Sequence, residues 1–326
     1  MILVTGSSGH IGNVLVRKLL ERNENIRIMT KDGQIPTCLL GLPIEVFKGD
    51  LKDKVAVDNS VKGVEYVFHL GGIISISTYN SSELTAVNVG GTENIVNSCI
   101  QHGIKRLVYT SSVHALPEGE FGTPITEMND FKKHKLFGAY SRTKASATLK
   151  VLEGVENGLD AVICYPSGVI GPFDFRGSEA GRLIRDYATN KLPVYIDGEY
   201  NFVDVRDVAE GLISALNKGR KGQSYILGGH RMSLDQFFTI LSEFEVKMKK
   251  PYKIPVIIAI LTAWIVETFC LVFRIKPLFT VYAIKVLQSN CEISSEKAKK
   301  ELDFKARSIN ESIRDGLSWL KENNKI

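Results

Sequence analysis

The chain opens on a strand-like run that leads directly into a glycine-rich turn and then into a helical pattern. Residues 2–5 are apolar and partly β-branched, which is typical of a buried strand. Three glycines follow at three-residue spacing, and the apolar residues of 14–20 then recur with helical period. A strand, a tight turn and a helix in this order bring free N–H groups and the helix dipole toward a pyrophosphate. We therefore predict a dinucleotide-binding opening whose cofactor contacts come from Gly6, Ser8, Gly9, His10, Ile11 and Gly12.

The spacing of these glycines is Gly-x-x-Gly-x-x-Gly, which differs from the Gly-x-Gly-x-x-Gly of the usual dinucleotide fingerprint. A glycine turn taken alone is often an ordinary loop. Its position directly after a first strand favours the nucleotide interpretation.

Composition narrows the class of protein. At 326 residues, with 44% hydrophobic and 24% charged residues, the chain has the make-up of a globular α/β protein with one large domain or a core and a smaller cap. The net charge of +5 is mild and no basic run is long enough for a nucleic-acid track. Five widely spaced cysteines without a C-x-x-C pair favour free thiols in a reducing compartment. Because the histidines and cysteines form no cluster with the spacing of metal ligands, we expect no bound metal. Because the first strand begins at residue 2, we expect no signal peptide and a cytoplasmic protein.

The end of the second predicted strand, 26–29, bears on the choice of cofactor. An acidic residue there would bind the adenosine ribose hydroxyls and favour NAD. The sequence instead has Thr30 and Lys31, with Asp32 only after the lysine. Lys31 can pair with a 2′-phosphate, which favours NADP and leaves NAD as the alternative. A surface lysine without a role remains the competing interpretation.

Further strand ends complete the predicted cofactor wall. A third strand, 44–47, is followed by an aspartate that can reach the adenine, and a fourth, 64–70, closes on two glycines where the backbone can approach a ligand. The expected contacts are Asp50, Leu51, Leu70, Gly71 and Gly72. A helical pattern over 84–101 and a fifth strand over 106–110 follow. This alternation predicts a doubly wound parallel sheet, the Rossmann architecture, with right-handed crossovers. We assign 1–165 to nucleotide binding, with 200–218 returning to that part, and 166–326 mainly to a smaller substrate-binding region.

Catalytic candidates follow the fifth strand. Ser112 stands just past its carboxyl end, and Tyr140 and Lys144 lie four residues apart, on one face of a predicted helix. A tyrosine titrates near ~10, and an ammonium beside it would lower that pKa toward the range useful for acid–base catalysis. Ser112 could hold a substrate oxygen against the phenol. A Tyr-x-x-x-Lys pair also arises by chance in many helices, so the interpretation depends on its companions.

Taken together, these motifs resemble the extended short-chain dehydrogenase/reductases, also called the NAD-dependent epimerase/dehydratase superfamily. The resemblance covers nearly the whole chain and is closest to the dihydroflavonol-4-reductase-like branch, which includes hopanoid-associated sugar epimerases. Besides the glycine turn, it rests on Gly49-Asp50-Leu51, Asn88-Val89-Gly90-Gly91-Thr92, Tyr109-Thr110-Ser111-Ser112, Tyr140-x-x-x-Lys144, Tyr165 to Pro172, Phe202 to Ala209, Pro172-Phe173-Asp174-Phe175-Arg176, Gly181 to Ile184, Tyr225 to Gly229 and Ser295 to Leu302.

The resemblance implies a catalytic triad of Ser112, Tyr140 and Lys144, with Asn88 completing a proton relay that some members use. It also implies cofactor contacts from Tyr140, Lys144, Pro166 and Val169, and a homodimer formed through a helix bundle. Two positions depart from the family pattern. Tyr165 stands where many nucleotide-sugar members have arginine, which weakens the sugar interpretation, and Gly71-Gly72 replaces a more usual pair of alanines.

The substrate side is less informative. Ser112 and Tyr140 should face the substrate, and Arg176, with Arg182 and Arg185, could bind a substrate phosphate or be solvated arginines. Residues 254–273 form an apolar run with one charge, Glu267. Its length suits a membrane span, but we expect a buried or crevice-lining helix pair first, and peripheral membrane contact or an apolar substrate channel second.

Three functions compete at this point. The first is an NAD(P)-dependent oxidoreductase acting on a carbonyl or secondary alcohol, with a membrane-associated lipid or steroid dehydrogenase as a variant. The second is a nucleotide-sugar epimerase or dehydratase that retains NAD and acts on a sugar substrate. The third is a cofactor-sensing regulator, which the intact Tyr–Lys pair disfavours.

Overall fold

The computed structural model describes the chain except residues 76–81, 129–135, 245–250 and 274–279, and except the side chains of 271 and 272. Its centre is a seven-stranded sheet in the order β10-β6-β5-β4-β1-β2-β3, and every neighbouring pair in it is parallel. The strands are β1 (Ile2–Thr5), β2 (Ile26–Thr30), β3 (Glu45–Lys48), β4 (Tyr66–His69), β5 (Arg106–Thr110), β6 (Ala161–Pro166) and β10 (Ser224–Leu227). The predicted doubly wound parallel sheet is confirmed.

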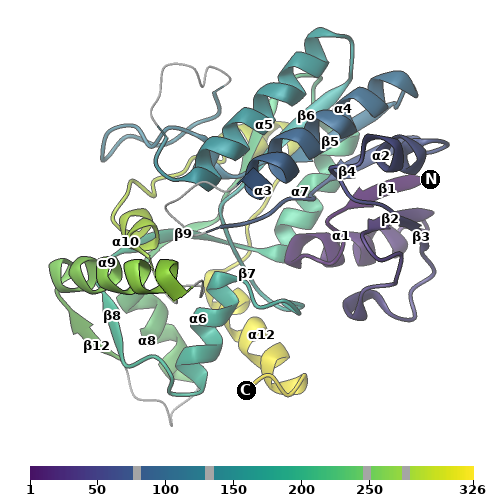
Figure 1. The fold of residues 1–326 in the computed structure, drawn as a ribbon. Coiled ribbons are helices and arrows are strands. Elements are labelled where there is room, and N and C mark those ends of the chain that lie inside the picture. Colours follow the sequence, from purple (N-terminus) through teal and green to yellow (C-terminus); the bar gives the residue numbers. More distant parts are fainter. Residues whose placement is uncertain (76–81, 129–135, 245–250, 274–279) are drawn as a thin grey trace.

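Helices cover both faces of this sheet, so its central strands are apolar on both sides (Figure 1). One face packs on α2 (Lys54–Val61), α4 (Gly91–Gln101) and α5 (Ala139–Glu156). The other packs on α1 (His10–Leu20), α7 (Val205–Lys218) and α11 (Glu296–Leu302). Between β4 and α4 the chain forms α3 (Ser82–Thr85) and a π-helical turn, η2 (Ala86–Gly90), which together begin the helix predicted over 84–101.

The second part of the molecule lies beyond the carboxyl ends of the central strands. A three-stranded sheet, β11-β9-β7, packs with three helices around an aromatic cluster that contains Tyr187, Phe237 and Phe238. These elements are β7 (Gly168–Ile170), β9 (Glu199–Asp204), β11 (His230–Ser233), α6 (Glu179–Ala188), α8 (Leu234–Phe244) and α12 (Ile309–Glu322). A two-stranded ribbon of β8 (Val194–Ile196) and β12 (Tyr252–Ile254) leads to α9 (Val256–Phe273) and α10 (Val281–Leu287). Short 3-10 turns, η1 (Thr37–Leu39) and η3 (Val113–Ala115), complete the elements.

The two parts share chain segments. Within the predicted return over 200–218, β9 joins the smaller sheet through β7, whereas α7 packs on α1 and the central sheet. Strand β10 then pairs with β6 at the edge of the central sheet, although the sequence assigned that segment to the substrate region. Two acidic side chains hold the start of α7: Asp204 caps the helix by accepting from the Arg206 N–H, and Asp207 accepts from the Arg307 N–H.

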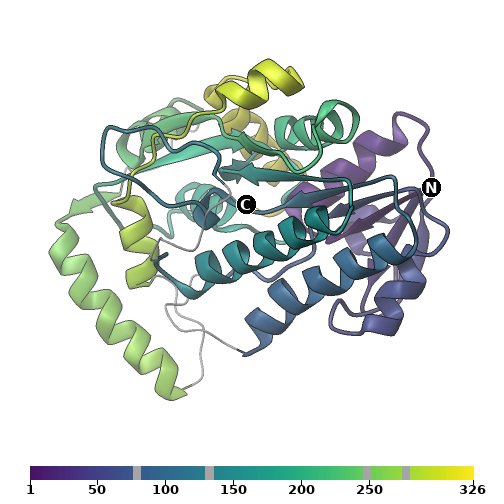
Figure 2. The ribbon, with the colours of Figure 1, turned by 90° about the horizontal axis from the view of Figure 1, so that it is seen from above.

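The apolar run 254–273 differs from its first prediction. It forms one helix, α9, whose large side chains face outward, and not a buried or crevice-lining pair. Among the side chains of α9 that the structure describes, the buried ones are small, such as Ala259 and Ala263. Figure 2 shows α9 at the edge of the molecule with no element on its outer side. In the part of the chain that the structure describes, no helix is long and apolar enough to cross a membrane.

Candidate active site

The predicted site residues lie along one edge of the central sheet. Because all seven strands run parallel, their carboxyl ends meet at that edge, where open α/β sheets bind their ligands. Most stretches of predicted contacts follow a strand of this sheet or close it, whereas Val169 lies within β7 of the smaller sheet. The stretches are Gly6 to Gly12 after β1, Lys31 after β2, Asp50 and Leu51 after β3, Leu70 to Gly72 after β4, Ser112 after β5, and Pro166 and Val169 in β6 and β7.

The glycine turn is packed so closely that side chains are excluded from it. Gly6 has a φ of 71°, and a Cβ there would lie 2.7 Å from the Gly71 nitrogen. A Cβ on Gly12 would lie 2.2 Å from the Gly6 carbonyl oxygen. Gly9 is the N-cap of α1 and no side chain caps this end, so the first N–H groups of the helix stay available to an anion. A dinucleotide pyrophosphate therefore fits this turn.

His10 has a structural contact besides its predicted one. Its Nε2 lies 2.9 Å from the Pro172 carbonyl oxygen, which ties the start of α1 to the loop after β7. Burial lowers the pKa of His10, although Asp174 acts in the opposite direction. The neutral His10 ring therefore contacts the loop after β7, while the backbone N–H of His10 belongs to the glycine turn.

Lys31 and Asp50 form an ion pair with 3.1 Å between Nζ and Oδ2. Lys31 is 66% exposed, so the pair lies at the rim of the site. Burial tends to raise the pKa of Asp50, but the Lys52 N–H and Lys31 outweigh it and hold the pKa below its usual range. A cation is therefore present where the ribose end of a dinucleotide is expected, beside a carboxylate.

A chain of buried polar groups beneath the site was not predicted. The Thr5 hydroxyl accepts from the Gly71 N–H and lies 2.7 Å from His69 Nδ1, and His69 Nε2 lies 3.0 Å from the Thr92 hydroxyl. Thr92 donates to the Asn88 carbonyl, so it must accept from Nε2. Burial, helped by the charge of Lys144, lowers the pKa of His69 to about 3. A neutral His69 thus joins the ends of β1 and β4 to the π-helical turn.

Asn88 lies in that π-helical turn, a distortion that often marks functional sites. Its side-chain oxygen accepts from the Ile73 N–H at 2.7 Å, and its nitrogen donates to the Ile73 carbonyl and the Thr143 hydroxyl. The side chain therefore connects the loop after β4 to the helix residue that precedes Lys144. The structure accounts for Asn88 as a positioning residue, and its part in a relay stays a prediction.

Ser112 and Tyr140 meet at the end of β5. Ser112 is the N-cap of η3, and its hydroxyl accepts from the His114 N–H at 3.3 Å. Burial raises the pKa of Tyr140 to about 12, and a hydrogen bond with the Ser112 side chain acts in the opposite direction. The sequence predicted a lowered pKa, but desolvation is the larger effect and raises it, so the pKa lies further from neutral pH than that of a free tyrosine.

Lys144 lies one helical turn after Tyr140, and its side chain is 6% exposed. Its Nζ donates to the Thr110 carbonyl at 2.7 Å and lies 4.7 Å from the centre of the Tyr109 ring. Tyr109 in turn stacks on His69 with 5.6 Å between ring centres. Burial lowers the pKa of Lys144 to about 7. The face of the Tyr109 ring favours the charged ammonium and thus opposes that shift.

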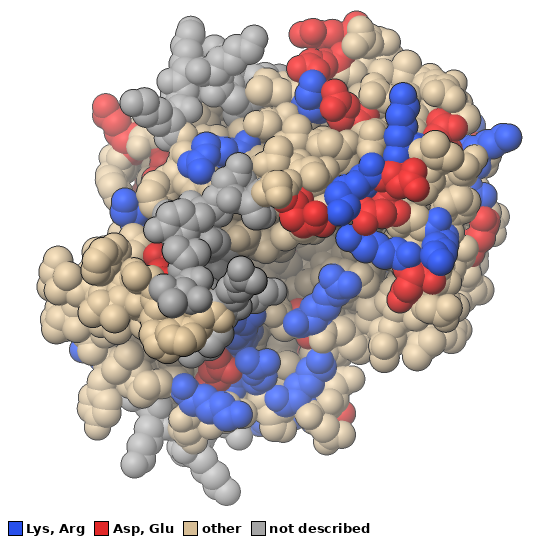
Figure 3. Space-filling model, viewed as in Figure 1, with Lys and Arg blue, Asp and Glu red and all other residues tan. Residues whose placement is uncertain are grey.

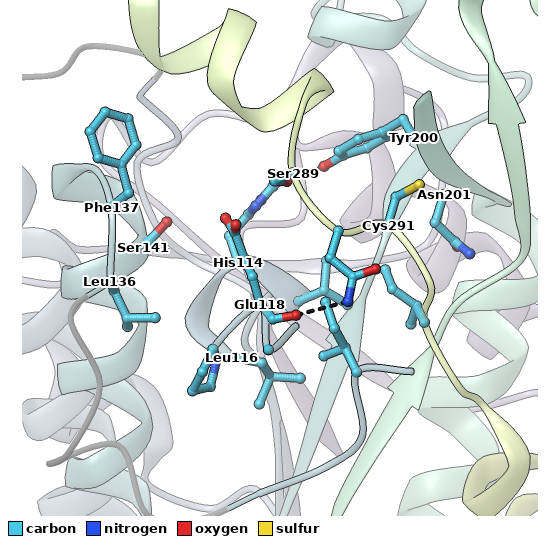
Figure 4. Close-up of a pocket in the computed structure, with 16 residues that line it drawn as sticks. His114, Leu116, Glu118, Leu136, Phe137, Ser141, Tyr200, Asn201, Ser289 and Cys291 are labelled. Carbon is cyan, nitrogen blue, oxygen red and sulfur yellow. Dashed lines mark hydrogen bonds between the residues drawn. The ribbon is translucent and has the colours of Figure 1, made fainter. Parts of the chain in front are cut away.

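A cavity of about 270 Å³ opens beside these residues (Figure 4). His114 lines it, and the His114 ring centre is 6.4 Å from that of Tyr140. The His114 Nε2 lies 2.6 Å from the Tyr200 hydroxyl, and burial lowers the His114 pKa to about 4. Much of the wall is apolar: Val113, Leu116, Ile125, Leu136, Phe137 and Ile293. The wall also has polar residues, among them Glu118, Asn201 and Asn290, so the cavity offers apolar surface together with hydrogen-bonding groups.

The predicted substrate arginines lie elsewhere. Arg176 and Arg185 line a separate hollow with Lys325, in the lower part of the molecule where Figure 3 shows several cations together. Arg182 pairs with Glu179 and Arg185 with Asp186, so both have structural partners. None of the three lines the cavity beside Tyr140.

The comparison with known protein families agrees with this geometry. The model of the NAD dependent epimerase/dehydratase family matches residues 2–228. The chain belongs to this family.

Individual relatives extend the likeness to nearly the full length. The chain is 31% identical to "Sterol demethylase protein B" of Methylococcus capsulatus over 99% of each chain. It is also 31% identical to the "Putative dihydroflavonol 4-reductase" of a Synechocystis strain, over 98% of this chain and 94% of the other. The crystal structure of gox2253 has 29% identity and a TM-score of 0.85, covering 100% of this chain and 99% of that one.

Proposed function

We propose that this family member is an NAD(P)-dependent oxidoreductase that reduces a ketone or aldehyde, or oxidises the corresponding alcohol. The observation that supports the proposal is the hydrogen bond between Ser112 and Tyr140 at the end of β5, with Lys144 one helical turn further along α5 and a partly apolar cavity beside them. The names of the two relatives, a sterol-processing protein and a dihydroflavonol reductase, support a mainly apolar substrate with a carbonyl or hydroxyl group.

The proposed chemistry divides among the three side chains. A nicotinamide supplies or accepts the hydride when it is bound. Ser112 donates a hydrogen bond to the substrate carbonyl oxygen and holds it against Tyr140. Tyr140 is protonated at neutral pH, with a pKa raised to about 12, and donates its proton to that oxygen. The Lys144 ammonium then stabilises the phenolate by its charge.

The first test is Tyr140→Phe, with a panel of carbonyl compounds that includes a dihydroflavonol and a sterol ketone. General acid catalysis contributes about 10²–10⁴-fold, so we expect turnover to fall by about that factor. Nucleotide affinity should stay nearly unchanged, as measured by titration of the protein with NADPH. Tyr66→Phe is the matched control, because Tyr66 lies at the opposite end of a central strand. Unchanged turnover in Tyr140→Phe would rule out the proposed mechanism.

We propose NADPH as the preferred cofactor, with Lys31 pairing the 2′-phosphate. The Lys31 ammonium at the end of β2 supports this, because it is exposed. Its ion pair with Asp50 lies at the rim of the site and leaves room for a phosphate to contact the same ammonium. A charge-assisted bond is worth about 1.5–3 kcal/mol, so Lys31→Ser should weaken NADPH binding about tenfold or more. NADH affinity should change little. Equal losses for both nucleotides would contradict the assignment.

A nucleotide-sugar epimerase is the rival proposal, because the same three residues can oxidise and re-reduce one sugar. It requires a retained NAD, so the nucleotide released by denaturing the fresh protein distinguishes the two. Stoichiometric NAD would favour the epimerase, and an empty protein that then binds NADPH more tightly than NADH would favour the reductase. The ion pairs of Arg182 and Arg185 support the reductase.

A further inference from the structure

Helix α9 exposes more apolar surface than any role in the core explains. Of the large side chains that the structure describes on α9, seven are at least half exposed: Ile257, Ile258, Leu261, Trp264, Ile265, Phe269 and Phe273. Tyr252, just before the helix, is 81% exposed. The surface over α9 is uncharged in the view of Figure 3. Contiguous apolar surface of this kind marks an interaction site.

The helix is also fixed in orientation. Ala259, Ala263 and Cys270 are buried on its inner side, where α9 packs against α10 and Ile196. The exposed side chains recur every three or four residues, so they form one stripe on the outer side. Figure 2 shows α9 along the outer edge of the molecule, and its exposed side chains form an apolar face over this helix of 18 residues.

Positive charge flanks this face in the sequence. From 245 to 279 the chain has six cations and two acids. Before the helix stand Lys247, Lys249, Lys250 and Lys253, and after it Arg274 and Lys276; of these, the described Lys253 pairs with Asp197. An apolar helix with aromatic residues and basic flanks is the pattern that lies in the surface of an anionic bilayer.

We propose that α9 binds the surface of an anionic lipid bilayer, with its outer stripe inserted at the level of the headgroups. The sequence selects this occupant, because an apolar helix with exposed aromatic residues between basic stretches of the chain is attracted to anionic lipid. A second copy of the chain on the same face is the competing outcome of the test. This proposal concerns an interaction surface and does not depend on the reaction.

Flotation of the purified protein with vesicles tests the proposal directly. The vesicles are phosphatidylcholine alone, or phosphatidylcholine with about a third phosphatidylglycerol. We expect binding to the anionic vesicles, weakened by salt. The combined variant Ile257→Gln, Leu261→Gln and Ile265→Gln should bind about a hundredfold more weakly, because three apolar contacts are lost. Leu40→Gln, at an equally exposed leucine far along the chain, is the matched control and should bind like the parent.

Tryptophan fluorescence gives a second readout. The chain has two tryptophans, of which Trp264 is 65% exposed and Trp319 is 7% exposed. Anionic vesicles should shift the emission to shorter wavelength, and Trp264→Phe should abolish that shift. Absence of vesicle binding, or binding unchanged in the triple variant, would overturn the proposal. A dimer of the parent protein in light scattering would also overturn the proposal, if the triple variant is a monomer and Trp264 is shielded from acrylamide before vesicles are added.

Discussion

The glycine turn and helix α9 represent opposite extremes of packing in this molecule. At the turn, a single added carbon on Gly12 would lie 2.2 Å from a backbone oxygen. On α9, whole side chains such as Trp264 and Leu261 are more than half exposed. The conformation of the turn depends on close backbone contacts, and the glycine residues that permit them can be recognised in the sequence. The side of α9 that is exposed depends on which elements pack against it, and its uniformly apolar sequence does not indicate that side.

The largest effect is expected at the glycine turn. Gly12→Ala should destabilise the protein by about 3 kcal/mol, because the backbone on both sides must move, and should abolish nucleotide binding. Gly90→Ala is the matched control. Gly90 has helical angles (φ −62°, ψ −41°) and open space around it, so alanine should change the free energy of unfolding by less than about 1 kcal/mol. Urea unfolding and nucleotide titration measure both. Equal effects would remove the distinction between the two glycines.

A smaller effect is expected beneath Lys144. The Tyr109 ring favours the ammonium, so Tyr109→Leu should lower the Lys144 pKa further, by about one unit for a cation–π contact of 1–2 kcal/mol. If the ammonium is needed for turnover, activity falls as pH rises through that pKa, and this fall moves to lower pH in Tyr109→Leu. Tyr109→Phe keeps the ring and should keep the parent pH profile. A shift as large in Phe as in Leu would assign the effect to the hydroxyl.

The smallest effect is expected on α9. Leu261→Gln should change the free energy of unfolding by less than about 0.5 kcal/mol, because the side chain is already in solvent. Ala263→Gln is the control on the same helix. Ala263 is fully buried, so the larger polar side chain should cost about 1–3 kcal/mol. Thermal unfolding compares the two variants. A large loss in Leu261→Gln would mean that the outer stripe has an intramolecular role.

Local features explain what the sequence predicted well. The strand–turn–helix opening and the Tyr140–Lys144 spacing depend on residues within a few positions of each other, and the structure has both on the expected elements. The His69 contacts could not be predicted, because its partner Thr5 is 64 residues away. The smaller sheet was missed because β7 has only three residues. The pKa direction of Tyr140 was wrong because burial depends on the whole fold.

Strand β10 has a consequence for synthesis of the chain. Every predicted nucleotide contact, from Gly6 to Val169, leaves the ribosome before Ser224–Leu227, yet these last residues close the edge of the central sheet against β6. Helix α7, which covers α1, also comes late in the chain. A nascent chain of 200 residues therefore holds the complete glycine turn together with an unpaired strand edge and an uncovered sheet face. The nucleotide half is therefore made early in translation, but it exposes this strand edge and this sheet face until residues 205–227 have also been made.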